Sequence, residues 1–318
     1  MKKILLLTLP IIAFSANSDL NNNLDKYHTL VSKWVMDKSD VVDRYLASKD
    51  DNKNLSNTKV SVAYEIGSTS KGKFSNNYDF SLSLNLPRFK DKVNLTLEKV
   101  NAYKSLINSK ESFLSKSDSQ TNSDDNYNLG ISFSQWSGKK YATHLSGGVR
   151  FNSKFLLEPY VGVVSSYNIK STKKTEINIK NTLRYYLAGE IKDNISSQLL
   201  YNYGSDVLLG WLGNFEYTSK SSKQTLTSEF ILQKEYSNYN FYRIGFVANA
   251  KLTHFKNPKK NDFYIYFKYH NKYQNKDWMF YEITPSVELR KENKYHTTVG
   301  LKLKVGATFG GIRDLFKK

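Results

Sequence analysis

The chain has 318 residues, with 47 Lys and Arg against 29 Asp and Glu, a formal net charge of +18 and no cysteine. The lack of cysteine excludes disulfides and thiolate metal sites. The basic excess indicates an anionic partner, but evenly scattered lysines without a clustered basic face or a recognisable motif exclude nucleic acid as that partner.

The N-terminus is typical of a secretory signal peptide. Lys2 and Lys3 precede an apolar run over residues 4–14, and Ala13 and Ala16 offer small residues for cleavage. We therefore predict a signal peptide over residues 1–16. No stretch in the chain approaches the ~20 consecutive apolar residues that a membrane-spanning helix needs.

An amphipathic helix is predicted next, over residues 24–47, followed by a polar linker that ends at residue 57. Apolar residues recur there at three- and four-residue steps: Leu24, Tyr27, Val31, Trp34, Val35, Val42, Tyr45 and Leu46. The simplest expectation is a helix packed against the rest of its own chain. Three alternatives are a plug in the mouth of a barrel, a helix lying on the inner leaflet of the outer membrane, and a docking site for a periplasmic partner.

From Lys59 onward, apolar residues recur at every second position. The last example is the clearest, because Val299, Leu301, Leu303 and Val305 alternate with Thr, Gly and Lys. About 14 such segments, or 12 if a pair merges, occupy residues 58–309, and an even number is the rule for bacterial barrels. The prediction is an all-β fold, a transmembrane antiparallel β-barrel in the cell outer membrane, with one amphipathic helix before it.

Three details refine this barrel. The longest connection, residues 101–125, is rich in Ser, Asn, Asp and Lys, and is expected outside the cell. Pro285 falls inside a predicted strand, where it requires a bulge or a weakly paired position. Residues 310–318 follow the last strand as a short periplasmic tail.

Three stretches resemble a porin-like family of bacterial outer-membrane β-barrels with an N-terminal periplasmic helix. They are the helix segment 34–46, the hairpin LNLPRFKDKVNLTL at 84–97 and the final strand pair 278–311. The resemblance implies a fold and an outer-membrane location, but no activity, catalytic residue or cofactor. The last strand also resembles the signal that the barrel assembly machinery recognises, with Gly306 and the aromatic Phe309. Phe316 is the alternative, but alternation stops at Gly310, which favours Phe309.

Because successive side chains of a strand face opposite sides, the same alternation predicts which charged side chains face the lumen. The basic ones are Arg150, Lys180, Arg184, Arg243, Lys251, Lys268, His270, Lys302 and Lys304, and the acidic ones are Glu65, Asp79, Glu98, Glu158, Glu176, Glu229, Glu282 and Glu288. Mixed signs in a confined space favour a structural network of ion pairs. The alternative is a basic ladder of Lys268, Lys302 and Lys304 that favours anions.

A catalytic site has one weak candidate. His144 and Ser146 resemble the His-x-Ser step of outer-membrane phospholipase A and of lipid A deacylases, in which His activates Ser. Their phase points them away from lipid, and only Asn128 and Glu158 on neighbouring strands are candidates to orient His144. The five His residues are scattered without ligand spacing, so neither a metal nor a cofactor is predicted.

The sequence thus predicts a non-enzymatic channel for the passive passage of small hydrophilic solutes, with an anionic preference as a further hypothesis. The alternatives are a non-conducting envelope scaffold or surface-interaction barrel and, less favoured, an outer-membrane lipid hydrolase. The expected partners are outer-membrane lipid and lipopolysaccharide, the barrel assembly machinery and a periplasmic protein bound through the helix.

Overall fold

A computed structural model describes residues 18–46, 58–85, 93–99, 127–137, 140–151, 157–170, 174–237, 240–253, 256–273, 276–291 and 294–310. The predicted signal peptide, the linker, the long connection at 101–125 and the tail beyond Gly310 lie outside the described residues.

One α-helix, α2, spans Ser18–Leu46, and a short 3-10 helix, η2, spans Ser219–Ser221. The strands are β1 Lys59–Thr69, β2 Phe74–Asn85, β3 Val93–Lys99, β4 Tyr127–Ser137, β5 Tyr141–Phe151, β6 Leu157–Lys170, β7 Thr175–Tyr186, β8 Glu190–Tyr203, β9 Val207–Thr218, β10 Lys223–Ser237, β11 Asn240–Thr253, β12 Lys256–Tyr273, β13 Lys276–Arg290 and β14 Thr297–Phe309.

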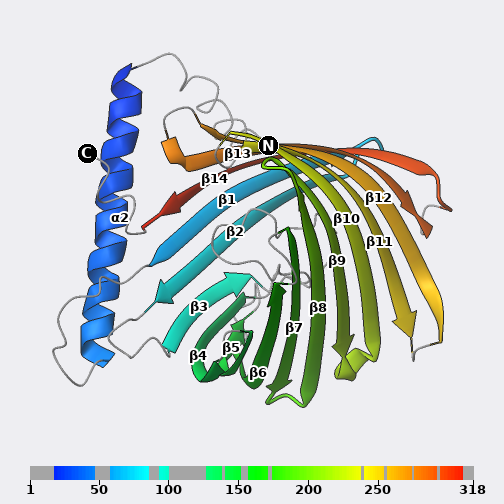
Figure 1. The fold of residues 1–318 in the computed structure, drawn as a ribbon, viewed down its shortest axis with the longest axis horizontal. Helices are drawn as coiled ribbons and strands as arrows, with labels where there is room; N and C mark the ends of the chain where they lie inside the picture. The colour runs from blue at the N-terminus through cyan, green and yellow to red at the C-terminus, as the bar shows by residue number, and fades with distance from the viewer. Residues whose placement is uncertain are drawn as a thin grey trace.

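The fourteen strands form one closed barrel in which each strand pairs with its neighbours in sequence, and β14 closes the wall against β1. All of these pairings are antiparallel, and the closing register places Val60 opposite Phe309. Figure 1 shows α2 at one end of the barrel, beside the ends of β14, β1 and β2. We call this end, where β1 begins and β14 ends, the terminal rim. The predicted all-β barrel with one preceding helix is confirmed.

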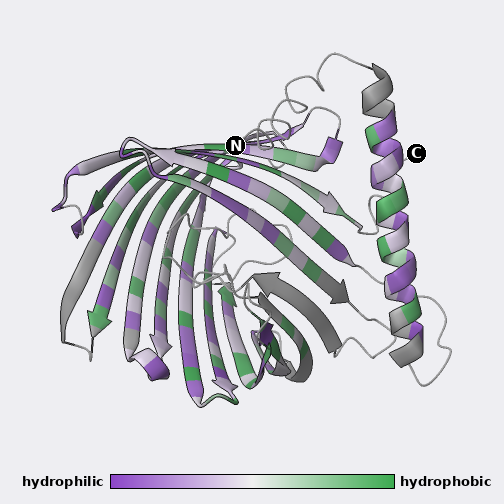
Figure 2. Cartoon of the chain, turned by 180° about the vertical axis from the view of Figure 1, so that it is seen from behind, coloured by the Kyte–Doolittle hydropathy of each residue, from purple (hydrophilic) through white to green (hydrophobic). Residues whose placement is uncertain are grey.

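Alternate side chains on the strands face opposite sides of the wall, and the two sides differ in polarity. On β11, Ile244 is 51% exposed while its neighbour Arg243 is 1% exposed. Figure 2 shows the resulting alternation of apolar and polar residues along the strands. The exposed side carries an apolar belt that includes Val161, Ile179, Leu199, Phe230, Ile244, Ile265, Val299 and Leu301. Such a belt is the lipid-facing surface of a transmembrane barrel.

Glycines let large aromatic rings lie flat against the inner wall. A Cβ added to Gly245 would sit 2.3 Å from the ring of Tyr266, and one added to Gly306 would sit 2.3 Å from the ring of Phe280. Both pairs join neighbouring strands. Pro285 has no paired residue on β12, where the ladder omits it between Tyr266–Ser286 and Tyr269–Ile283, although it pairs with Leu301 of β14. The predicted weak pairing at this proline is therefore found.

The helix begins at Ser18, six residues before the predicted start. The apolar period begins only at Leu24, but Ser18 and Asp19 are residue types that favour a helix N-terminus. Within the described residues, no helix combines the length and the apolar character needed to cross a bilayer.

The helix packs against its own barrel, through polar side chains and through Val35, one residue of the apolar stripe. His28, Ser32 and Ser39 are 6%, 1% and 2% exposed, whereas Tyr27 and Trp34 are 65% and 61% exposed. Most of the described apolar stripe therefore faces away from the barrel. Polar side chains dock because the rim presents backbone groups with no strand partner, and such groups need hydrogen bonds.

Candidate functional site in the barrel lumen

The inward-facing side chains form two regions with different access to water. The first, which we call the sealed wall, is the inner face of β10–β14 around Glu229, Arg243, Lys268, His270 and Glu282, and each of these side chains is buried. The second, the open wall, is the inner face of β5–β7, where His144, Arg150, Lys180 and Arg184 are only half-buried.

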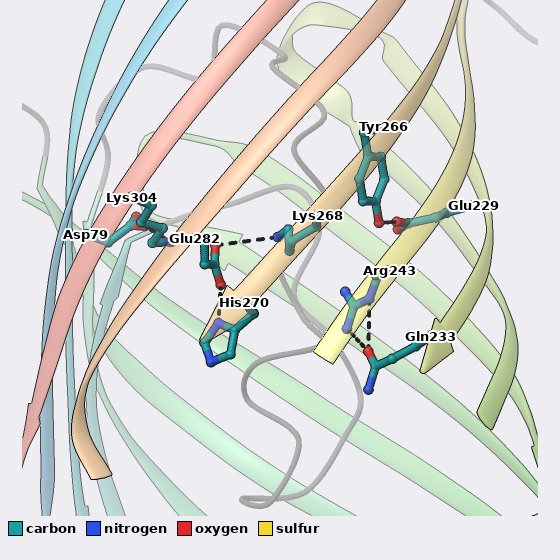
Figure 3. A network of polar contacts seen from close by, with 9 residues as sticks. All are labelled: Asp79, Glu229, Gln233, Arg243, Tyr266, Lys268, His270, Glu282 and Lys304. Carbon is teal, nitrogen blue, oxygen red and sulfur yellow. Dashed lines mark hydrogen bonds and ion pairs between the residues drawn. The ribbon is translucent and has the colours of Figure 1, made fainter. Parts of the chain in front are cut away.

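Glu282 is the centre of the sealed wall (Figure 3). Its Oε2 lies 3.6 Å from Lys268 Nζ, and its Oε1 accepts a hydrogen bond of 3.0 Å from His270 Nδ1. Lys304 lies directly across from Glu282 on β14, and its Nζ is 2.8 Å from Asp79 Oδ2. This chain of pairs connects four strands through the closure between β1 and β14.

A second group in the sealed wall joins β10, β11 and β12 (Figure 3). Arg243 donates from Nε and Nη2 to Gln233 Oε1, at 3.0 and 2.6 Å. Tyr266 donates its hydroxyl hydrogen to Glu229 Oε1. Arg243 stands directly across from Lys268. Like charges in that position repel each other, so Gln233 and Glu282 are needed on either side of them.

In the open wall, the two arginines lie over aromatic rings. Arg150 is paired with both Glu158 and Glu190 and lies 3.9 Å above the Tyr186 ring. Arg184 lies over the ring of Tyr160, at 5.4 Å.

Lys180, on β7, stands between Ser166 of β6 and Ser196 of β8. It makes no ion pair with any residue that the structure describes.

The predicted basic ladder is interrupted by acids. Lys268 is ion-paired with Glu282, and Lys304 is ion-paired with Asp79. Lys302, at the inward-facing position next to Lys304 on β14, is half-buried. Glu288 pairs with Arg290 at 2.7 Å near the end of β13. The lysines share the inner face, as their phase predicts, but much of their charge is compensated within the wall.

His144 and Ser146 share the inner face of β5, opposite the lipid-facing Leu145, which is 39% exposed. Neither His144 Nδ1 nor Ser146 Oγ has a hydrogen-bond partner within the described residues. Glu158, one of the two side chains considered to orient His144, is paired with Arg150 instead. The geometry therefore gives no support to a dyad. Among the described residues, no cluster of three or more His, Asp or Glu side chains is placed to hold a metal ion.

Two participants were missed at the sequence level. Gln233 binds Arg243, and Glu190 binds Arg150. Alternation places both on the inner face, and Gln233 stands directly opposite Arg243, but Glu190 on β8 is three strands away from Arg150 on β5, so no local pattern links that pair. A search restricted to charged residues overlooks Gln233 because its side chain is neutral.

The predicted assembly residue Phe309 ends β14 at the terminal rim and lies against α2. Its ring centroid is 5.4 Å from that of His28. Trp278 also stacks on His28, with ring centroids 4.3 Å apart. The end of the last strand is therefore part of the helix docking site.

No protein-family model and no curated protein matches the sequence. Among solved structures, the trimer form of in-vitro folded OmpT of Vibrio cholerae, an outer-membrane protein, is similar with a TM-score of 0.50 at 7% identity, over 80% of this chain and 99% of that one. A loop L8 deletion mutant of OmpT gives a TM-score of 0.49 at 5% identity over 80% and 99% of the two chains. The KdgM porin gives 0.34 at 12% identity over 79% and 99%.

At such low identity these similarities concern the fold alone. Together with the closed wall and its apolar belt, the first of them supports the predicted architecture. The chain has the fold of an outer-membrane β-barrel, and the cell outer membrane is its location.

Proposed function

We propose that the protein is a non-enzymatic channel that lets small hydrophilic solutes cross the outer membrane passively, with a preference for anions. The observation that carries this proposal is the contrast between the two lumen regions. Charged side chains of the open wall are half-buried, whereas those of the sealed wall are almost completely buried. Solutes therefore pass along the inner face of β5–β7.

The anion preference arises from the open wall rather than from the predicted ladder. Lys180 has no ion-pair partner among the described residues. Arg184 lies two inward-facing positions further along the same strand. A fixed positive charge in a narrow aqueous passage attracts anions and repels cations. Lys268 and Lys304, which are already paired, contribute less.

Conductance across a planar bilayer tests this proposal. The refolded mature protein should give steady current steps, and a salt gradient should give a reversal potential on the anion-selective side. Lys180→Glu should shift that potential toward cation selectivity. Lys220→Glu makes the same change of charge at an exposed position between β9 and β10, and should leave it unchanged. Cation selectivity of the unmodified protein would contradict the anion preference.

A non-conducting scaffold is the second candidate. Arg243, Lys268 and His270 are 1%, 1% and 0% exposed, so part of the lumen is packed closed against water. If the remaining passage is closed as well, the barrel presents only its outer surfaces to partners. Silent bilayers, both with α2 present and with it deleted, would favour this candidate over the channel.

A further inference from the structure

Helix α2 follows the terminal rim along three adjacent strands. Its docking contacts come from side chains three, four and seven residues apart, which lie on one face of a helix. They are Asp25 with Lys276 of β13 at 2.6 Å, His28 Nε2 donating to the Thr308 carbonyl oxygen of β14 at 3.0 Å, Ser32 Oγ accepting from the Gly310 amide at 3.1 Å, and Ser39 with Thr58, just before β1, at 2.5 Å.

The order of these contacts gives the direction of the helix. From Asp25 to Ser39 the partners run from β13 through β14 to β1, which are neighbours in the wall. Fourteen residues of helix cover about 21 Å, which exceeds the roughly 10 Å of the two strand spacings from β13 to β1, so the helix is long enough to contact all three strand ends. With the docked face turned toward the strand ends, one flank of the helix faces the bilayer and the other faces water.

The two flanks have opposite characters. At 100° per residue, one side of the docked face carries exposed apolar residues, which we call the apolar flank: Tyr27 at 65%, Leu30 at 55%, Val31 at 41%, Trp34 at 61% and Val41 at 52% exposure. The other side, the polar flank, carries the exposed residues Lys26, Thr29, Lys33, Asp37 and Arg44. Lys38 lies within the apolar arc, where its long stem allows the ammonium to reach headgroups.

The apolar flank is continuous with the lipid-facing belt. Phe309 lies on the outward phase of β14, after Leu301 and Leu303, and its ring contacts His28 of the docked face. The outer surface of β14 thus leads directly to the helix at the level where the belt ends. Trp and Tyr are residue types that settle at the boundary between headgroups and acyl chains.

We propose that α2 is an interfacial helix, whose apolar flank inserts into the membrane leaflet next to the terminal rim while its polar flank faces the periplasm. The helix bears four basic and five acidic residues, so it has no excess of positive charge. Burial of apolar surface therefore drives insertion. Anionic lipid is not required. The helix thereby holds the rim at a fixed depth, whether or not the lumen conducts.

Site-directed spin labelling tests this directly, because the chain has no native cysteine. Single variants Leu30→Cys and Val41→Cys report on the apolar flank, and Lys33→Cys and Asp37→Cys are matched controls on the polar flank. Each labelled full-length mature protein is reconstituted in phosphatidylcholine vesicles, with and without phosphatidylglycerol. Collisions of the label with oxygen and with a water-soluble nickel chelate are then measured.

Labels at 30 and 41 should collide with oxygen several-fold more than with the nickel chelate, at both lipid compositions, while labels at 33 and 37 show the reverse. Equal nickel accessibility on the two flanks would overturn the proposal. Exclusion of both reagents at 30 and 41 would also overturn it, because a protein surface, either a second copy or a periplasmic partner, would then cover the flank.

A second measurement avoids labels. Brominated phosphatidylcholine should quench the fluorescence of the unmodified protein more than that of Trp34→Phe, since Trp34 is on the apolar flank. Equal fractional quenching of the two proteins would count against insertion. Neither measurement depends on conductance, so a silent channel and a helix that stays out of the membrane are separate outcomes.

Discussion

Replacing Glu282 by Gln should strongly destabilise the barrel. The change removes the carboxylate that serves Lys268 and His270, which are 1% and 0% exposed. Removal of one partner from a buried ion pair costs about 3–5 kcal/mol, because the remaining charge is left uncompensated. Lys268 would lose this carboxylate in a buried site, so we expect a cost of about 3 kcal/mol, or roughly a hundredfold in the folding equilibrium.

The assay is equilibrium unfolding by urea of the protein refolded into vesicles, followed by tryptophan fluorescence. Glu288→Gln is the matched control, since Glu288 pairs with Arg290, whose side chain is 26% exposed. Partly exposed pairs contribute about 0–1 kcal/mol.

Adding Lys268→Met to Glu282→Gln should restore much of the lost stability, because it removes the positive charge that has lost its partner. A loss below about 1 kcal/mol for Glu282→Gln, or no recovery in the double variant, would refute the description of this network as a buried, interdependent unit.

Other predictions concern packing and assembly. Gly245→Ala should cost about 1–3 kcal/mol, because the new Cβ would lie 2.3 Å from the buried Tyr266 ring, whereas Gly147→Ala, with no atom nearer than 3.8 Å, should cost much less in the same urea assay. Similar losses for the two variants would contradict the role of ring packing. Phe309→Ala should lower the yield of folded barrel in cells, measured by heat-modifiable mobility on gels, while Phe316→Ala leaves it unchanged. The opposite order would show that the assembly signal lies in the tail.

Much of the architecture follows from local periodicity. Alternation such as that of Val299, Leu301 and Leu303 depends only on the geometry of an extended strand, in which successive side chains point to opposite sides. A membrane on one side and a polar lumen on the other make that alternation strong. Strand existence and the inward phase of Arg243, Lys268 and Lys304 were therefore predictable without coordinates.

The pairing of the lumen charges was not predictable in the same way. Lys304 and Asp79 are 225 positions apart and meet because β14 closes against β1. The alternation along a strand shows which side chains point into the barrel. The partner that each one contacts depends on the strand register and on the length of the side chain. The predicted ladder of Lys268, Lys302 and Lys304 was drawn from phase alone, and the acids that neutralise two of its members come from β2 and β13.

By itself, the sequence determined an amphipathic helix and a barrel with an apolar outside, because each of these depends on short-range pattern and composition. Only the tertiary structure decided which lumen charges pair with one another and which helix face meets the barrel. The docking through His28 and Ser32 could not be predicted from amphipathicity, which anticipates burial of the apolar face. The closed barrel instead leaves the Thr308 carbonyl and the Gly310 amide at its rim, and these backbone groups require polar partners.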